Sequence, residues 1–535
     1  MSSISSTKHY DYIIVGGGTA GCLLANRLSA DAGKSVLLME AGTSTKYKPI
    51  MKIPISYLHT MMNPSTCWCY NTEEQEGLSG RSIGYPRGKV LGGCSSINGM
   101  LYLRGARSDY DHWSSVAKDD SWNGESMDEI FDSLSSEWPT VPQSLQWDVL
   151  DDFRGAISEA RPGVQVGNPV DANQEMIGFF KVNQKNGMRV SANDAFLTPV
   201  LDRPNLEVTT EREVKRLLFG SGVCDVGGEK VVTGIEFHDG QRNINVGKDS
   251  TVILAAGAVN SPNLLQRSGV GDPRDLASAG IDLSLHLKGV GKNLQDHLQI
   301  RSVFKLKDGT DTLNTRYHNL VGLMSMALEY ALKRAGPLSM APSQLGAFLK
   351  SSEGVHTPDL EFHVQPLSLP KFGESLDDFP AITTSICNLR PTSRGEVRIG
   401  GDGGVIVDPK YLSTVADRQI ASDSIRLSRL CVNSSDFAAK YEPQELLPGA
   451  QIQSTEELAD AAGRIGTSIF HPVGTAKMGV KGDDMAVVDN ELRVFGTKNL
   501  RVVDASIMPT ITSGNTCSPV LAIAEKAARM IIGKK

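Results

Sequence analysis

The stretch of sequence that decides the fold is Gly16-Gly17-Gly18-Thr19-Ala20-Gly21. The apolar run Tyr10–Val15 precedes it, as expected for a strand that is buried on both faces of a parallel sheet. The residues that follow, Cys22–Leu28, place apolar side chains on one helical stripe. A second apolar run, Ser35–Met39, ends in Glu40, at about the 20-residue separation where a ribose-binding acid belongs. The pattern predicts a dinucleotide-binding strand–turn–helix–strand unit.

Each glycine of this motif has a physical role. Gly16 permits the tight turn, Gly18 lets the backbone approach a pyrophosphate, and Gly21 allows close packing of helix on strand. The start of the helix offers unpaired N–H groups and a partial positive charge to that anion. The motif does not separate NAD from FAD, because both dinucleotides use it.

Composition narrows the class of protein. Of the 535 residues 40% are hydrophobic, so the chain can bury a large core. A net charge of −7 without any long basic run argues against a nucleic-acid partner. No run approaches the ~20 apolar residues of an integral membrane segment. Residues 1–8 are serine-rich and lack the apolar core of a secretory signal, so we expect a cytoplasmic protein.

The remaining pattern predicts a mixed α/β protein, α+β overall, with two domains. The strand-like run Thr251–Ala258 leads into another glycine turn, which makes the nucleotide domain discontinuous. We expect a Rossmann-like domain over residues 8–305, to which residues 464–535 return. Residues 306–463 would form a substrate-binding cap built on an antiparallel sheet with helices.

Shorter patterns complete this interpretation. Leu206–Thr210 and Val231–Phe237 are predicted to be strands of a small antiparallel sheet. Met324–Leu332 has a helical pattern. Residues 85–99 form a second glycine-rich loop, which suits a phosphate or a planar ring but is equally compatible with an ordinary turn.

Among the ten histidines, none are paired at the i, i+3 or i+4 spacing of a helical metal site, so we predict no metal. His471 lies in the small-residue loop Ser468–Gly474. A neutral imidazole in such a loop suits a general base, whereas the alternative is a histidine buried for structure alone.

These motifs together resemble the glucose-methanol-choline flavoprotein oxidoreductases, over essentially the whole chain. Six ordered segments carry the resemblance: residues 16–21 with Glu40, 86–98, 257–271, 289–297, 471–479, and 503–509 with Asn515 and Thr516 beyond.

The resemblance implies one bound FAD. Its contacts would be Gly16, Gly18, Thr19, Ala20, Gly21, Glu40, Ala41, Arg87, Val90, Gly92, Ser96, Asn98, Gly99, Val214, Asp504, Ala505, Asn515 and Thr516. Glu40 would hold the adenosine ribose, and the backbone of Val214 would meet the adenine. Some members link the flavin covalently to a histidine near the end of the first signature. The matching residue here is Asn98, so we expect non-covalent FAD.

The resemblance also supplies a partner for His471, namely Asn515. His471 would take the hydroxyl proton of a primary alcohol, Asn515 would hydrogen-bond the developing alkoxide, and hydride would pass to flavin N5, giving the aldehyde. The chain looks most like the bacterial choline-dehydrogenase-like and FAD-dependent alcohol dehydrogenases. Choline itself would require a carboxylate within an aromatic cage, and with 6% aromatic residues no such cluster can be picked out.

Several alternatives stay open. Electrons would pass to a quinone or other acceptor, or to O2 with release of H2O2 if the protein is an alcohol oxidase. A hydroxynitrile lyase uses the same scaffold without net redox chemistry, and a flavin-binding structural protein is a third reading. A peripheral position at the inner membrane and a homo-oligomer are both compatible with the sequence. Trp68, Tyr70 and Phe348 are candidate substrate contacts, and His297 is expected to shape the domain junction.

Overall fold

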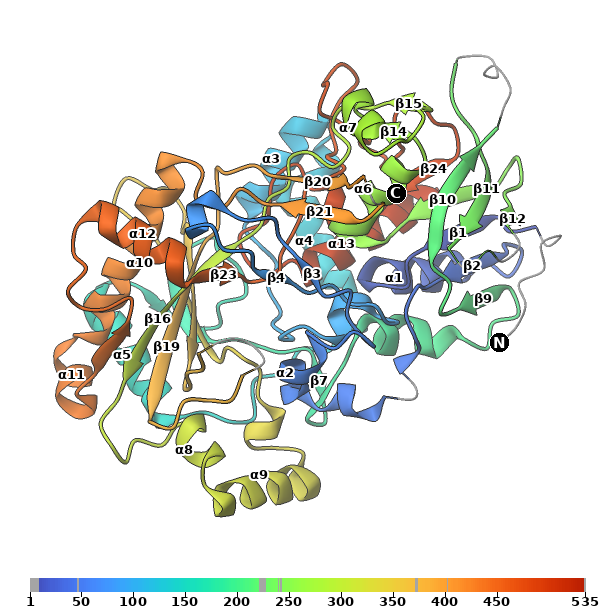
Figure 1. Ribbon diagram of the computed structural model, residues 1–535. Helices are drawn as coiled ribbons and strands as arrows, with labels where there is room; N and C mark the ends of the chain where they lie inside the picture. The colour runs from blue at the N-terminus through green and yellow to red at the C-terminus, as the bar shows by residue number, and fades with distance from the viewer. Residues whose placement is uncertain are drawn as a thin grey trace.

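The computed structural model describes seven stretches of the chain: residues 9–45, 48–220, 228–238, 240, 243–370, 374–401 and 403–533. The expectation concerning residues 1–8 lies outside them. Two sheets dominate the described residues, a five-stranded one at the right of Figure 1 and an eight-stranded one at the left. Both the dinucleotide fold and the second, antiparallel sheet are as predicted, and the fold class is confirmed.

The five-stranded sheet is parallel, in the order β24-β13-β1-β2-β9. Its strands are β1 (Tyr12–Val15), β2 (Val36–Met39), β9 (Leu206–Thr209), β13 (Thr251–Leu254) and β24 (Leu500–Val502). Strand β2 is buried along its whole length, as the continuous apolar run predicts. The sheet therefore joins segments from the beginning, middle and end of the chain.

The glycine turn after β1 leads directly into α1 (Thr19–Leu28). Gly16 has a φ of 110°, which favours glycine. A Cβ atom on Gly21 would lie 1.9 Å from the carbonyl oxygen of Gly16, so α1 can pack this closely only with glycine there. These contacts fix the start of α1 at the carboxyl end of β1.

The prediction for Leu206–Thr210 is wrong about the sheet it joins. This segment is β9, and it pairs in parallel with β2, with Leu206 opposite Val36. A four-residue strand has too little alternation to reveal its partner, which lies far earlier in the chain. The other predicted strand is β11 (Val232–Phe237), and it does lie in a small antiparallel sheet. Its neighbours there are β10 (Val214–Phe219) and β12 (Ile244–Asn245).

The eight-stranded sheet runs β22-β16-β19-β18-β17-β6-β5, and β23 also pairs with β16. All pairings are antiparallel except that between β5 and β6. Its strands are β5 (Gln165–Val166), β6 (Met176–Phe179), β16 (Leu298–Lys305), β17 (Leu345–Leu349), β18 (Leu360–Gln365), β19 (Ala381–Asn388), β22 (Gln444–Leu447) and β23 (Gly466–Ser468). Residues on both sides of the expected boundaries at 306 and 463 thus contribute to it, and those boundaries remain a proposal.

One face of this large sheet is apolar and covered by helices. Leu360, Phe362 and Val364 of β18 point into that core. The covering helices are α5 (Asp148–Ala160), α10 (Val415–Val432) and α11 (Ser435–Tyr441). The opposite face presents polar side chains toward the five-stranded sheet, and a cavity lies between the two.

The other helices surround these sheets. They are α2 (Tyr57–Thr60), α3 (Arg107–Ala117), α4 (Gly124–Leu134), α6 (Gly257–Arg267), α7 (Pro273–Ser278), α8 (Leu313–Tyr317), α9 (Leu320–Lys333), α12 (Thr455–Ile465) and α13 (Cys517–Ile531). Helix α13 packs against α1, beneath the glycine turn. Within the described stretches, no helix has the length and apolar character needed to cross a membrane.

Candidate active site

One continuous cavity brings most of the predicted site residues together. Those that line it are Gly16, Gly18, Thr19, Ala20, Glu40, Ala41, Arg87, Asn98, Gly99, Val214, His471, Asp504, Ala505, Asn515 and Thr516. Glu40 follows β2 of the five-stranded sheet, and Val214 begins β10 of the small antiparallel sheet. His471 and Asn515 lie where the two large sheets face each other. The cavity therefore spans from the dinucleotide motif to the predicted catalytic pair.

Four predicted contacts do not line this cavity: Gly21, Val90, Gly92 and Ser96. They support its wall instead. The Gly92 N–H donates to the carbonyl oxygen of Gly17 at 2.8 Å, and the Ser96 hydroxyl donates to that of Leu91 at 2.8 Å. Their hydrogen bonds hold the second glycine-rich loop in shape against the first.

The two glycine-rich loops meet at the start of α1. A Cβ atom on Gly93 would lie 2.8 Å from the Cα atom of Gly18, so only glycine fits at this crossing. The free N–H groups and positive dipole end of α1 open into the cavity here. This is an arrangement suited to a pyrophosphate.

Glu40 lies at the end of β2 and is held by two backbone groups. Its Oε2 atom accepts from the Gly17 N–H at 2.8 Å, and its Oε1 atom accepts from the Gly42 N–H at 2.7 Å. Burial raises the pKa of Glu40 to about 7, although these two hydrogen bonds oppose the shift. The carboxylate is therefore oriented toward the cavity to receive hydroxyl donors such as those of a ribose.

Trp68 and Tyr70 lie at the Val214 end of the cavity. Their rings stack with centroids 5.9 Å apart, and the Lys89 ammonium lies 4.0 Å from the Trp68 ring. Lys89 in turn pairs with Glu213 at 3.4 Å, next to Val214. These aromatic side chains thus border the place expected for adenine, and we assign them no substrate contact. Phe348 is fully buried in a hydrophobic cluster and does not line the cavity.

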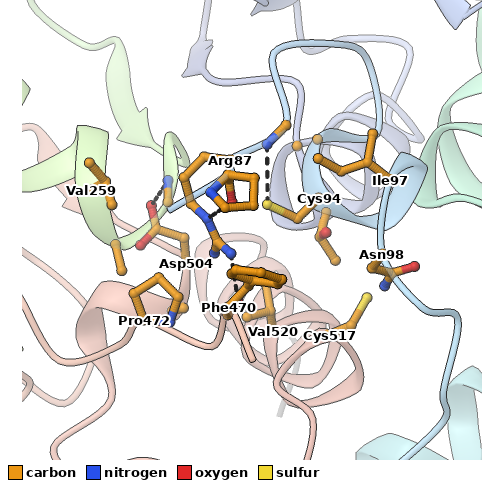
Figure 2. A pocket seen from close by; sticks show the side chains of 18 of the residues that line it. Arg87, Cys94, Ile97, Asn98, Val259, Phe470, Pro472, Asp504, Cys517 and Val520 are labelled. Carbon is orange, nitrogen blue, oxygen red and sulfur yellow. Dashed lines mark hydrogen bonds between the residues drawn. The ribbon is translucent and has the colours of Figure 1, made fainter. Parts of the chain in front are cut away.

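Asn98, which we expect in place of a flavin-linking histidine, lies at the edge of the cavity. Its Oδ1 atom accepts from Arg189 at 2.8 Å and from the Met100 N–H at 3.0 Å. Figure 2 shows Asn98 beside Cys517 at one edge of the cavity. Burial raises the pKa of the Cys517 thiol to about 12, so this sulfur is not a thiolate nucleophile at neutral pH.

The predicted catalytic pair, His471 and Asn515, is in direct contact. The Nδ2 atom of Asn515 lies 3.0 Å from Nε2 of His471. On the other side of the imidazole, Nδ1 of His471 lies 3.1 Å from Nδ1 of His297. Nε2 of His297 lies 3.2 Å from the carbonyl oxygen of Leu389, which can only accept. His297 therefore donates from Nε2 and accepts at Nδ1, so His471 carries its hydrogen on Nδ1 and its lone pair on Nε2.

The Asp296 carboxylate binds the backbone N–H groups of both histidines. Its Oδ1 atom accepts from the N–H groups of His297 at 2.9 Å and of His471 at 2.7 Å. Its Oδ2 atom accepts from the hydroxyls of Ser468 and Tyr411. One buried carboxylate thus ties the loop before β16 to the loop after β23.

The residue before His471 adopts a strained conformation. Phe470 has a φ of 71°, which is unusual for a side chain of this size. Its carbonyl oxygen accepts from the Arg87 guanidinium at 2.6 Å, as Figure 2 shows, and its N–H donates to the Ser468 hydroxyl at 2.7 Å. These bonds hold the strained turn and so fix the direction of the imidazole.

The surroundings keep His471 neutral. Burial, followed by the neighbouring His297, His363 and Arg87, holds the pKa of His471 well below its ordinary value of 6.5. Its imidazole is consequently available as a base at neutral pH. The Oδ1 atom of Asn515 is buried without a hydrogen-bond partner, as expected where a ligand group is to be received.

Sequence reasoning missed two residues of this site. His297 was expected to shape the domain junction, yet it contacts His471 directly. His363 was not singled out, although it is fully buried and lines the cavity. The alternation along β18, with Glu361, His363 and Gln365 opposite the apolar residues, is the signal that places it on the cavity face.

No group of three or more His, Cys, Asp or Glu side chains able to hold a metal ion occurs among the described residues. The residues present do fit FAD. The glycine turns and the start of α1 suit the pyrophosphate, and Glu40 suits a ribose. At the other end of the cavity, the amide oxygen of Asn515 has no hydrogen-bond partner.

Known proteins match this chain over nearly its whole length. Residues 10–299 and 391–524 match the N-terminal and C-terminal family models described as GMC oxidoreductase. The chain is 37% identical to the alcohol dehydrogenase [acceptor] of Pseudomonas putida, covering 98% of this chain and 96% of that protein. It is 35% identical to the oxygen-dependent choline dehydrogenase of Staphylococcus saprophyticus, covering 99% and 96%. Among solved structures, pyridoxine 4-oxidase from Mesorbium loti is similar, with a TM-score of 0.85, 30% identity, and coverage of 98% and 100%.

Proposed function

The chain belongs to the GMC oxidoreductases, FAD-dependent enzymes that act on CH–OH groups, and from this premise we propose that it oxidises a primary alcohol to the aldehyde. The observation that carries the proposal is the contact between Asn515 and a neutral His471 in the cavity. A neutral base beside an amide donor is the arrangement that removal of a hydroxyl proton requires.

In the proposed mechanism, the substrate hydroxyl replaces the Asn515 amide at Nε2 of His471, and Nε2 takes the hydroxyl proton. The released amide hydrogens of Asn515 then stabilise the developing alkoxide, which would otherwise be a costly charge in a buried site. His297 accepts from Nδ1 of His471, so it keeps the lone pair on the substrate side before transfer and supports the imidazolium afterwards. Bound FAD supplies the acceptor for the hydride of the carbinol carbon.

We propose that FAD is held without a covalent bond. The amide of Asn98 offers no nucleophile, and its oxygen is occupied by Arg189 and Met100. Electrons would pass on to a quinone or another acceptor. The name of the Pseudomonas relative supports such an acceptor, whereas the staphylococcal relatives support the alternative of O2 as oxidant, with H2O2 as product. A quinone acceptor resides in lipid, so we place the enzyme peripherally at the inner membrane.

The experiment that tests the function is anaerobic mixing of the holoenzyme with a series of primary alcohols. Bleaching of the flavin absorbance by an alcohol supports oxidation, and a chromophore that no alcohol reduces would point to the hydroxynitrile lyase alternative. His471→Ala should retain FAD and lose about 10²-fold or more of the bleaching rate. A variant that bleaches at the wild-type rate would show that His471 is not the base, and a structural flavoprotein would not be bleached by alcohol in either form.

The acceptor requires a separate measurement. Turnover with an artificial dye under nitrogen is compared with peroxide release in air for each alcohol that bleaches the flavin. Rapid dye reduction with little peroxide supports the dehydrogenase, and matching peroxide release supports the oxidase.

A further inference from the structure

Helix α9 exposes an unusual amount of apolar surface. Leu320, Met324, Leu328 and Leu332 are 72%, 66%, 60% and 73% exposed, and Val321 is 74% exposed. Only Met326 and Tyr330 of this helix are buried. Figure 1 shows α9 with α8 at the lower edge of the molecule, projecting beyond the eight-stranded sheet. Apolar side chains concentrated in this way on one element mark an interaction surface.

The apolar side chains share one half of the helix circumference. At 100° per residue, the positions on this half are 320, 321, 323, 324, 327, 328, 331 and 332, and all of them are apolar. The inward half carries Met326 and Tyr330 at i and i+4, with Glu329 beside them. The helix is therefore amphipathic, but its broad apolar half faces away from the protein and not into the core.

The conformation of α9 does not depend on that apolar half. The Asn319 side chain caps its start by accepting from the Val321 N–H at 2.9 Å. The Tyr330 hydroxyl donates to the carbonyl oxygen of Gly187 at 3.1 Å, in the turn between β7 (Gln184–Lys185) and β8 (Met188–Arg189). The exposed side chains are thus presented by a helix that is already fixed.

We propose that α9 is an interfacial helix that inserts its apolar half into the surface of a lipid bilayer with anionic headgroups. Exposed cations gather on the inward, polar half at the C-terminal end of the helix. Lys333 and Arg334 end the helix, the Arg334 guanidinium lies 5.1 Å from the Tyr330 ring, and Lys185 lies in the hairpin that packs against it. An apolar face with Lys and Arg on the opposite, polar face is the pattern by which helices lie in the plane of an anionic membrane surface.

The form of α9 favours lipid over a second copy of the chain. Its apolar half lies on a single helix that projects from the lower edge of the molecule (Figure 1). A stable protein interface buries about 800 Å² of complementary surface on each partner, whereas a fluid bilayer surface needs no complementary partner.

The position of α9 also suits the proposed acceptor. The chain runs from α9 through a short helical turn, Pro337–Ser339, to Pro342 and Ser343, which line the active-site cavity. Lipid contact through α9 would hold that cavity wall near the membrane surface. This inference rests on the proposed peripheral location, and it identifies α9 as the helix that contacts the membrane.

The test is flotation of the holoenzyme with phosphatidylcholine vesicles, with and without phosphatidylglycerol. We expect binding that is stronger with phosphatidylglycerol and weaker at high salt. The variant that removes the apolar half combines Leu320→Gln, Met324→Gln and Leu328→Gln. Its vesicle partition should fall roughly a hundredfold, because lipid would otherwise cover all three side chains.

A matched control replaces three exposed apolar side chains elsewhere: Val166→Gln, Val415→Gln and Leu430→Gln, at positions 62%, 86% and 54% exposed. It should bind vesicles as the wild type does. Equal loss in both variants, or no binding by the wild type, overturns the proposal. So does a wild-type dimer in vesicle-free buffer that the α9 variant dissociates, because a second copy would then cover the helix.

Activity separates this proposal from the proposed function. Oxidation of a soluble alcohol with a soluble dye should be unchanged in both triple variants, since none of the six residues lines the cavity. Vesicle binding without any alcohol oxidation would contradict the function and leave α9 as proposed. Alcohol oxidation without vesicle binding would contradict only the role of α9.

Discussion

The Nδ1 atoms of His297 and His471 lie 3.1 Å apart, and a single hydrogen is shared between them. Because the Leu389 carbonyl fixes the hydrogen of His297 on Nε2, that shared hydrogen belongs to His471. His297 is therefore a positioning residue. It sets which nitrogen of the His471 imidazole carries the lone pair that we propose as the base.

His297→Ala should lower kcat/KM for the alcohol by about tenfold or more, because a buried N–H of His471 loses its acceptor and the other tautomer becomes accessible. His297→Gln, whose Oε1 atom can accept the same hydrogen, should retain more activity. Rapid anaerobic flavin bleaching measures both. Equal losses in the two variants, accompanied by equal loss of thermal stability, would mean that the residue only supports the fold.

The pH dependence of alcohol oxidation follows from the lowered pKa of His471. The neutral form is the base, and burial with neighbouring positive groups extends its range to acid pH. We expect kcat/KM to stay constant as pH falls through 6.5 and to decline only at more acidic values. A bleaching profile with its midpoint at 6.5 or above would contradict the buried, neutral imidazole.

Protein stability should respond to acid for the same reason. The folded state holds the pKa of His471, and by burial that of His297, below the ordinary value of 6.5. Below pH 6.5 the unfolded chain thus binds more protons than the folded chain, and the free energy of unfolding falls as pH decreases. Denaturant titrations of the wild type and His471→Gln should show a shallower acid decline in the variant.

Glu40→Gln should weaken FAD binding by about tenfold or more, because an amide cannot accept from both Gly17 and Gly42 and also receive a ribose hydroxyl. Since burial raises the pKa of Glu40 to about 7 in the cofactor-free protein, wild-type affinity should increase as pH rises across 7. Equilibrium dialysis of flavin measures both effects. Glu76→Gln, at an exposed position, is the control, and a flat pH dependence of wild-type affinity would contradict this role.

Gly93→Ala should abolish FAD retention, whereas Gly80→Ala should not. Both glycines have positive φ, 53° and 76°, so each substitution carries a similar backbone cost of about 1 kcal/mol. Only at Gly93 would the added Cβ meet the Gly18 backbone, whereas nothing lies within 4 Å at Gly80. The flavin-to-protein absorbance ratio of the purified variants distinguishes them, and equal ratios would contradict a tight crossing of the two loops.

Local structure could be predicted from the sequence, whereas contacts between segments distant in the sequence could not. The strand, glycine turn and α1 follow from neighbouring residues, and the family motifs are confirmed by full-length matches. The partner of β9 and the contact of His297 with His471 depend on segments brought together only by folding. Periodicity likewise predicts a helix over Met324–Leu332 but not that its apolar half faces outward.

The five-stranded sheet also constrains when the protein becomes functional. Strand β1 pairs with β13, and β13 pairs in turn with β24, while α13 packs on α1. Residues 500–531 must therefore be synthesised before β13 and α1 acquire their full set of neighbours. Such distant contacts form late in folding, so we expect stable flavin uptake only after these residues have been synthesised. The cofactor motif, although it is translated early, would then acquire its ligand late.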